Sequence, residues 1–244
     1  TRLNFSLSGI PYWNTDIGGF FNWPYHGGAE NKAYHELYTR WFQYGTFLPM
    51  QRSHGSGVKK EIYNLGKKGD WVYDSEEKYI NLRYALLPYL YSTGWQVTDN
   101  AGSFLRALFM DFNEDKKVHT ISNQYMFGKA FLVTPVTRNM YVFSDKEQWK
   151  DPYEDFSKTG TQDVYLPKGT KWFDFWTGEA LNGGQVVTKE VPIDIIPLYV
   201  RAGSIVPFGP KVQYSTEKKW NNLEILIYPG ADGEFVLYED ENDN

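Results

Sequence analysis

The sequence predicts an α/β region followed by an all-β region, and two observations support this division of its 244 residues. Before about residue 100, an apolar segment, a glycine-rich loop, a helical pattern and a second apolar segment follow one another. This order is typical of a βαβ unit with parallel strands. Beyond residue 100, short runs of β-branched and aromatic residues alternate with turn residues, which is typical of a β-sandwich.

The first elements form the predicted βαβ unit. Residues 3–13 are expected to be a strand with its lead-in, and residues 14–28 a glycine-rich loop. Apolar side chains recur at helical spacing through residues 30–44, and Gly45 is a suitable helix end. Residues 46–50 are then predicted to form the second strand.

A second helix is predicted after a long polar loop that spans residues 51–73. Asp74 and Ser75 are candidate N-caps, and acidic residues in the first turn favour a helix start there. The apolar pattern continues to Leu90, and Pro88 predicts a kink.

The rest of the chain predicts strands and turns. Residues 223–228 and 234–238 flank a Pro-Gly-Ala-Asp-Gly turn and are expected to pair as a hairpin, which would open a further β-domain cut off at Asn244. The other predicted strands are residues 130–135, 162–166, 169–175, 185–191 and 204–207.

Composition excludes several functional classes. The net charge is −5, no block of Lys or Arg suggests nucleic acid, and Lys59–Lys60 is interpreted as a solvated pair. No apolar run approaches the ~20 residues of a membrane span. The absence of cysteine excludes disulfides and thiolate metal sites but fits any compartment, whether periplasmic, extracellular or cytoplasmic. His26 and His35 do not form a metal site, and no cofactor motif is present.

Two polar clusters follow the apolar segments of the first region. Asp16 comes just after an apolar run and just before a glycine pair, and its carboxylate can either accept hydrogen bonds from sugar hydroxyls or cap its own loop. His54 can donate one hydrogen bond and accept another, which suits a sugar hydroxyl or a structural role in the loop. The high aromatic share, 18%, suits carbohydrate binding as well as core packing.

These motifs resemble those of glycoside hydrolase family 31, the α-glucosidases and α-xylosidases. The resemblance covers nearly the whole chain and implies the last two βα units of a TIM barrel in residues 1–100. It further implies a proximal β-sandwich in residues 101–208 and the start of a distal β-domain in residues 209–244. The matching stretches are GIPYWNTDIGGF (9–20), RWFQ (40–43), PMQRSHG (49–55), NLRYALLPYLYS (81–92), RALFMDF (106–112), QYMFGKAFLVTPV (124–136) and PLYVRAGSIVP (197–207).

The resemblance implies a retaining α-glycosidase that hydrolyses terminal α-linked xylose or glucose from oligosaccharides. The Arg-Ser-His-Gly sequence at residues 52–55 favours the α-xylosidase branch. In the family, the nucleophile and the acid/base lie in W-x-D-M-N-E and G-D-x-x-x-x-W type motifs before the GIPYW run, and neither motif occurs here. We therefore expect no catalytic residue in this chain, and expect it to be the C-terminal part of a longer enzyme whose N-terminal part supplies the acids.

Alternative functions share parts of this pattern. An α-transglycosylase or an α-glucan lyase of the same family carries the same motifs, and a non-catalytic carbohydrate-binding module would also be rich in aromatic strands. Because two βα units cannot close a barrel, we expect an exposed strand edge that leads to dimerisation or to a larger assembly.

The resemblance also assigns the candidate site. The matched Asp16 and His54 are expected to contact one sugar in the first subsite, from the C-terminal ends of neighbouring parallel strands. Trp13 is expected to line the pocket. Phe20 or its neighbour Phe21 could form part of a hydrophobic wall there, with core packing as the favoured interpretation of both. Arg52 is expected either to orient a neighbouring carboxylate or to form a surface salt bridge. The acidic residues of FMDF and WFDFWTG, Asp111 and Asp174, are expected to be structural.

Overall fold

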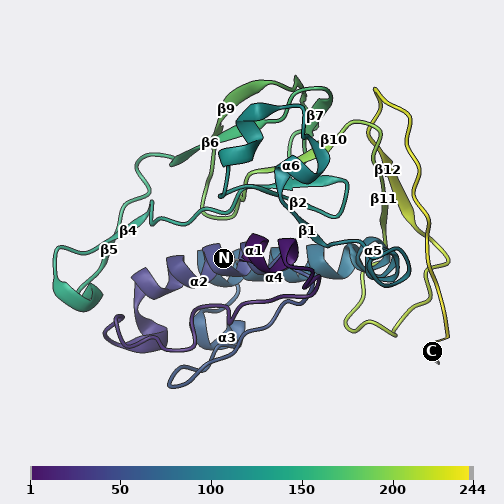
Figure 1. The fold of residues 1–244 in the computed structure, drawn as a ribbon. Helices are drawn as coiled ribbons and strands as arrows, with labels where there is room; N and C mark the ends of the chain where they lie inside the picture. Colours follow the sequence, from purple (N-terminus) through teal and green to yellow (C-terminus); the bar gives the residue numbers. More distant parts are fainter. Residues whose placement is uncertain (1, 242–244) are drawn as a thin grey trace.

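A computed structural model describes residues 2–241. Most of the helices form one layer and an antiparallel sheet covers it, whereas the short helix Leu108–Asp111 lies on the outer side of the sheet. The strands Ile205–Phe208 and Glu224–Ile227 pair beside the helix Leu87–Asp99 (Figure 1). The helices are α1 (Arg2–Leu7), α2 (Lys32–Thr46), α3 (Ile62–Leu65), α4 (Trp71–Ala85), α5 (Leu87–Asp99) and α6 (Leu108–Asp111), with 3-10 turns at Gly28–Glu30, Lys116–Thr120 and Glu147–Trp149. The strands are β1 (Leu105–Arg106), β2 (Tyr125–Phe127), β3 (Phe131–Val133), β4 (Val142–Phe143), β5 (Tyr153–Glu154), β6 (Thr161–Leu166), β7 (Lys171–Asp174), β8 (Ala180–Asn182), β9 (Gln185–Glu190), β10 (Leu198–Arg201), β11 (Ile205–Phe208) and β12 (Glu224–Ile227).

Helix α2 confirms the first predicted helix and starts at a polar cap. The Asn31 side chain accepts hydrogen bonds from the backbone N–H groups of Ala33 and Tyr34, at 2.9 and 3.2 Å. Gly45 lies inside the helix and does not end it. A Cβ at Gly45 would stand 2.5 Å from the Ile17 side chain, so the glycine allows the loop before α2 to pack closely against it.

The two predicted strands of the βαβ unit are wrong as regular strands. Residues 2–7 form α1, and residues 9–16 have no regular structure. Residue 46 ends α2, and residues 47–50 form a turn and a bend. The Phe47 N–H donates to the Tyr44 carbonyl, and the Leu48 N–H donates to the Gly45 carbonyl. A strand is stable only where its backbone N–H and C=O groups form hydrogen bonds with a neighbouring strand. Within the described chain, the parallel pairing is reduced to one bridge between Ile17 and Ser53.

The second long helix begins earlier than predicted. Helix α4 starts at Trp71 with Asp70 as its N-cap residue, and the predicted cap Asp74 lies inside it, where its side chain accepts a bond from Gly69 N–H. The helical path breaks between α4 and α5 with Pro88 in the first turn of α5, so the predicted kink is confirmed as a break.

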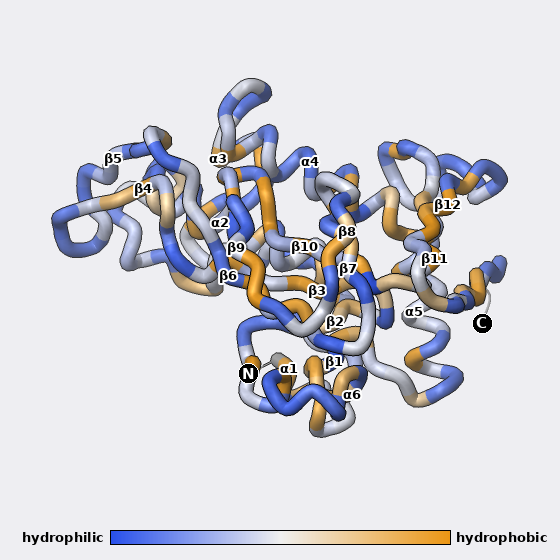
Figure 2. The backbone as a smooth tube through the Cα atoms, turned by 90° about the horizontal axis from the view of Figure 1, so that it is seen from above, coloured by the Kyte–Doolittle hydropathy of each residue, from blue (hydrophilic) through white to orange (hydrophobic). Residues whose placement is uncertain are grey.

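The main sheet has the strand order β1-β2-β3-β10-β7-β8, and all its pairs are antiparallel. Side chains alternate between its faces, as the pleat requires. Phe131 and Val133 of β3 pack toward the helices, whereas Leu132 packs with Trp172 and with Val164 of β6 on the other face. The ladder β6–β9 therefore forms a second layer, in agreement with the predicted β-sandwich. Figure 2 shows the hydrophobic stretches running through the middle of the molecule, along strands such as β3.

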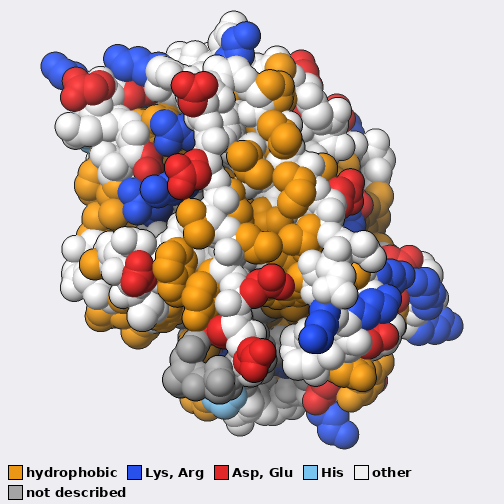
Figure 3. Space-filling model, turned by 90° about the vertical axis from the view of Figure 1, so that its right-hand side faces the viewer, with side chains coloured by type: hydrophobic (Ala, Val, Ile, Leu, Met, Phe, Trp, Pro, Cys, Tyr) orange, Lys and Arg blue, Asp and Glu red, His pale blue; other side chains and the backbone are white. Residues whose placement is uncertain are grey.

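The predicted C-terminal hairpin is wrong. Strand β12 pairs with β11, and residues 234–238 form no strand. Tyr238 instead stacks on Trp95 of α5, with ring centroids 5.1 Å apart and nearly parallel planes. Exposed apolar side chains of β12, α5 and the C-terminal segment gather on the face that Figure 3 shows.

A buried carboxyl group lies where α4 packs against α2. Glu76 is 1% exposed, and within residues 2–241 neither of its carboxylate oxygens has a hydrogen bond of good geometry. Burial raises the pKa of Glu76 to about 9, and the nearby Thr39 hydroxyl opposes this shift only in part. The group is therefore protonated at neutral pH in the folded protein.

We expect Glu76→Gln to stabilise the fold increasingly as the pH rises. Above about pH 4.3 the unfolded chain loses the Glu76 proton, whereas the folded chain keeps it up to the raised pKa of about 9. Between these values, the unfolding free energy of the wild type should lose up to ~1.4 kcal/mol per pH unit through this one group, and the variant should not. Urea unfolding at several pH values measures this slope.

Glu77→Gln is the matched control, because Glu77 is the next residue on the same helix but is partly exposed and paired with Lys68. This control should keep the wild-type slope. An unchanged slope in Glu76→Gln would show that the buried carboxyl is ionised in the folded protein.

Candidate functional site

Two loops meet beside α2 and hold most of the predicted site residues. Ile17 N–H donates to the Arg52 carbonyl at 3.1 Å, and Ser56 N–H donates to the Phe20 carbonyl at 2.8 Å. With the parallel bridge between Ile17 and Ser53, these bonds fix residues 16–20 alongside residues 52–56. We call these two segments the paired loops.

Asp16 and Arg52 form an ion pair across the paired loops. The Arg52 guanidinium lies 2.9 Å from Asp16 Oδ1, and the two side chains are 28% (Asp16) and 54% (Arg52) exposed. Arg52 thus forms a partly exposed salt bridge, and its partner is Asp16. An exposed pair of this kind contributes little to stability, but it fixes the direction of the carboxylate.

His54 lies on the same side of the paired loops as Phe20. Their ring centroids are 5.3 Å apart in an edge-on arrangement, and both side chains are exposed. Phe20 continues the contact to Phe21, which in turn touches Trp23, the most exposed of these rings at 80%. Core packing is therefore the wrong interpretation of Phe20 and Phe21 in this structure.

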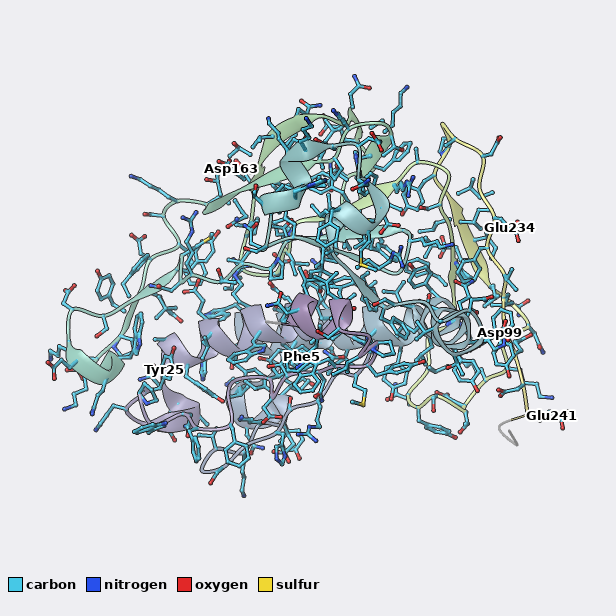
Figure 4. All side chains as sticks on the ribbon, in the orientation of Figure 1. Phe5, Tyr25, Asp99, Asp163, Glu234 and Glu241 are labelled. Carbon is cyan, nitrogen blue, oxygen red and sulfur yellow. The ribbon has the colours of Figure 1, made fainter. Side chains whose placement is uncertain are left out.

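Trp13 lies apart from this cluster. Its ring stacks on Phe5 of α1, with centroids 4.0 Å apart and an angle of 13° between the planes. Phe5 is labelled on α1 in Figure 4. The neighbouring Tyr12 hydroxyl donates to the Gly94 carbonyl of α5 at 2.9 Å. The structure thus brings together Asp16, Phe20, Arg52 and His54 but not Trp13.

The sequence analysis missed two residues that support the paired loops. The Lys60 ammonium donates to the carbonyls of Gly19 and His54, one in each loop. Lys60 is buried, which lowers its pKa, so its interpretation as a solvated lysine is wrong. The Tyr38 hydroxyl of α2 bonds to Ser53 Oγ at 2.5 Å and donates to the Lys60 carbonyl at 2.7 Å. Backbone acceptors leave no pattern in a sequence, so only the helical spacing of Tyr38 was visible.

The remaining polar candidates are structural. Asp111 pairs with Arg106 at 2.8 Å, and Asp174 pairs with Lys189 at 2.6 Å while it caps the turn that follows β7. Over residues 2–241, no group of three His, Cys, Asp or Glu side chains is arranged to hold a metal ion. In the same part of the chain, no helix is long and apolar enough to cross a membrane.

Comparison with protein families assigns both regions of the chain. The model of the glycosyl hydrolases family 31 TIM-barrel domain matches residues 1–93, and that of the family 31 C-terminal domain matches residues 101–206. The chain belongs to glycoside hydrolase family 31. It combines the end of the family's TIM barrel with a C-terminal β domain, as the sequence predicts.

Individual relatives agree with this assignment. The chain is 42% identical to an α-xylosidase of Saccharolobus solfataricus over 239 residues, which are 98% of this chain and 29% of the relative. It is 30% identical to α-glucosidase 2 of Bacillus thermoamyloliquefaciens, covering 98% of this chain and 27% of that protein. The chain therefore spans less than a third of these relatives.

Solved structures are similar over the same extent. The family 31 α-xylosidase of Xanthomonas citri matches with a TM-score of 0.85 and 42% identity, over 98% of this chain and 24% of that one. A family 31 dextranase of Flavobacterium johnsoniae, in complex with isomaltotriose, matches with a TM-score of 0.80 and 33% identity. The match covers 98% of this chain and 27% of the dextranase chain.

We expect Gly55→Ala to separate the paired loops. A Cβ at Gly55 would lie 2.5 Å from both the Phe20 carbonyl oxygen and the Lys60 ammonium, and the carbonyl cannot move without its loop. The unfolding free energy should fall by ~1–3 kcal/mol, and the NMR signals of the His54 ring should shift.

Gly94→Ala is the control, because a Cβ there meets its nearest atoms at an ordinary 3.7 Å inside α5. It should leave the His54 signals close to wild type and should not lower the stability, since alanine favours a helix by up to about 1 kcal/mol over glycine. Unchanged His54 signals in Gly55→Ala would contradict the close approach of the two loops.

Proposed function

We propose that the paired loops form one wall of the first sugar subsite of a retaining α-glycosidase that removes terminal α-linked xylose. The proposal rests chiefly on one observation: Asp16, Arg52, His54 and Phe20 lie together on two adjoining loops, with the carboxylate fixed by its ion pair. These loops belong to the part of the chain that matches the family's barrel domain.

Each residue has a role that suits a sugar ring. The Asp16 carboxylate accepts hydrogen bonds from hydroxyl groups, and each such bond to a charged group contributes roughly 1.5–3 kcal/mol. The exposed His54 ring donates or accepts one further bond. The Phe20 ring offers an apolar surface for the C–H groups of the sugar.

The cluster supports a binding role and not the bond-breaking step. A retaining glycosidase uses two carboxyl groups about 5–5.5 Å apart, one as nucleophile and one as acid/base. Asp16 is held by an arginine within the paired loops. We propose that the reacting carboxyl groups come from another part of the enzyme. Bonds from Asp16 and His54 would then strengthen as the ring flattens in the transition state.

Xylose is proposed ahead of glucose for two reasons. The Arg-Ser-His-Gly sequence at residues 52–55 favours the α-xylosidase branch. Two α-xylosidases, one matched by sequence and one by structure, reach 42% identity, whereas the α-glucosidases of Bacillus thermoamyloliquefaciens and Saccharolobus solfataricus match at 30% and 32%.

Transfer of the sugar to another carbohydrate is the second candidate. An isomaltosyltransferase of Sporosarcina globispora is 31% identical over 93% of this chain, so the same segment also occurs in a transferase. A product analysis separates the two reactions, since hydrolysis releases free sugar and transfer yields a longer oligosaccharide. We further propose the division into residues 1–100, 101–208 and 209–244. The first boundary lies between α5, which ends at Asp99, and the main sheet, which begins at Leu105, whereas the pairing of β11 with β12 crosses the second boundary.

We expect Asp16→Asn and His54→Ala each to lower kcat/KM by about 10- to 100-fold on an aryl α-xyloside, because each removes a bond that strengthens in the transition state. The measurement uses the enzyme that carries this segment together with its reacting carboxyl groups. The far-UV circular dichroism should not change, because both side chains are at least partly exposed.

Asp163→Asn provides the control. Asp163 is exposed on β6, on the opposite side of the helix layer from the paired loops (Figure 4), and should leave kcat/KM at the wild-type value. Wild-type kcat/KM in both Asp16→Asn and His54→Ala would refute the proposed subsite. A larger kcat/KM for the aryl α-glucoside than for the xyloside would refute the preference for xylose.

A further inference from the structure

The segment before the second loop is held by the side chain of one arginine. Arg83 of α4 donates to the carbonyl oxygens of Thr46 at 2.7 Å, Leu48 at 2.5 Å and Pro49 at 2.8 Å. In the described chain, no carboxylate pairs with Arg83, and its hydrogen-bond acceptors are these backbone groups. The Arg83 guanidinium therefore fixes the backbone conformation of residues 46–49.

Among the carbonyls of residues 46–49, that of Phe47 is not bound by Arg83 and instead accepts a hydrogen bond from the β domain. The Tyr125 hydroxyl, on β2 of the main sheet, donates to the Phe47 carbonyl at 2.8 Å in a buried setting. Four successive carbonyls, those of residues 46–49, are thus bound by two side chains from two different regions of the chain. Since this segment has no strand partner, its carbonyls depend on such donors.

We infer that Arg83 and Tyr125 are positioning residues that fix residues 46–49 and thereby set the Arg52–His54 loop for sugar binding. The inference rests on the proposed function of the paired loops. It makes the main sheet part of the sugar site, because Tyr125 binds Phe47, five residues before that loop begins at Arg52. The Tyr125 hydroxyl of the β domain then controls the affinity of a site that lies on the other region.

The chain offers matched controls for a purely structural role. Tyr141 is equally buried and its hydroxyl also donates to a backbone carbonyl, that of Val191, at 3.0 Å. Arg40 is a second buried arginine that donates to backbone carbonyls, but to those of residues 191, 192 and 195, which are not in the paired loops. Variants of these two residues lose the same kind of bond elsewhere.

The first experiment uses the 244-residue chain and NMR signals of its four histidine rings. Tyr125→Phe removes one hydroxyl and should shift the His54 signals, while leaving those of His119 unchanged. Tyr141→Phe should destabilise the fold at least as much, since it loses bonds to both Val191 and Gly160, but should leave His54 unshifted. Equal effects of the two variants on His54 would overturn the inference.

The second experiment measures kinetics in the enzyme that carries this segment. Tyr125→Phe and Arg83→Met should each lower kcat/KM on the aryl α-xyloside by about tenfold, with kcat falling as well as KM rising, since they misplace groups whose bonds strengthen in the transition state. Arg83→Lys keeps a cation and should recover part of the loss. Tyr141→Phe and Arg40→Lys should retain wild-type kcat/KM. Where Arg83→Met does not fold, Arg83→Lys and Tyr125→Phe still decide the question.

The outcomes separate this inference from the proposed function. Wild-type kcat/KM in Tyr125→Phe and Arg83→Lys, with a loss in Asp16→Asn, would overturn the positioning role of Arg83 and Tyr125 and leave the subsite standing. Shifted His54 signals in Tyr125→Phe, with wild-type kcat/KM in Asp16→Asn and His54→Ala, would overturn the subsite and with it the role of these two residues in sugar binding.

Discussion

Glu36 and Arg40, one turn apart on α2, each bind backbone groups of the β domain from a buried position. The Glu36 carboxylate accepts hydrogen bonds from the N–H groups of residues 140, 141 and 142, at 2.6 to 3.3 Å. The Arg40 guanidinium donates to the carbonyls of residues 191, 192 and 195. Burying two unpaired charges would be costly, so the two regions must dock with these backbone dipoles in place.

The same helix also anchors the candidate site. Its Tyr38 hydroxyl binds Ser53 in the second loop, and its Gly45 lets the Ile17 side chain pack against the helix. The two loops therefore take their positions from α2, as the β domain does from Glu36 and Arg40. A shift of α2 would move the site and the domain interface together.

Helix α4 reinforces this arrangement from the other side. Lys78 and Tyr79 both donate to the Asp194 carbonyl, and the Tyr79 hydroxyl accepts a bond from Ile196 N–H. Gln43 of α2 donates to the carbonyl of the residue preceding Asp194, Ile193, at 2.7 Å. The segment between β9 and β10 is thus held by side chains of two helices, which explains why it is ordered without belonging to a strand.

Sequence patterns predicted the elements whose partners lie nearby. Helix α2 and the main-sheet strands β3 and β7 follow from local periodicity or turn residues, whereas β10 was not predicted as a strand and appears only within the family motif at residues 197–207. The strands expected at residues 3–13 and 46–50 are absent because a parallel ladder depends on neighbours that local pattern cannot supply. The choice of β11 as the partner of β12 was hidden for the same reason, since the turn at residues 229–233 favours a local hairpin equally well.

In the candidate site, too, some residues could be predicted from the sequence and others could not. Asp16 and His54 were visible because polar side chains directly follow apolar runs, and the structure does bring their loops together. Lys60 and Tyr125 were not visible, because both bind backbone carbonyls and such acceptors are present at every residue.

The two buried arginines show how this part of the molecule is held without a ladder. In a sheet, each carbonyl is satisfied by the N–H of a neighbouring strand. At residues 46–49 and 191–195, Arg83 and Arg40 provide the donors instead, and the five N–H groups of one guanidinium can satisfy several carbonyls at once. Such a donor sits on a helix that is itself fixed by packing. The geometry of the loops that carry Arg52 and His54 is therefore set by tertiary contacts, and those contacts extend into the β domain through the Tyr125 hydroxyl.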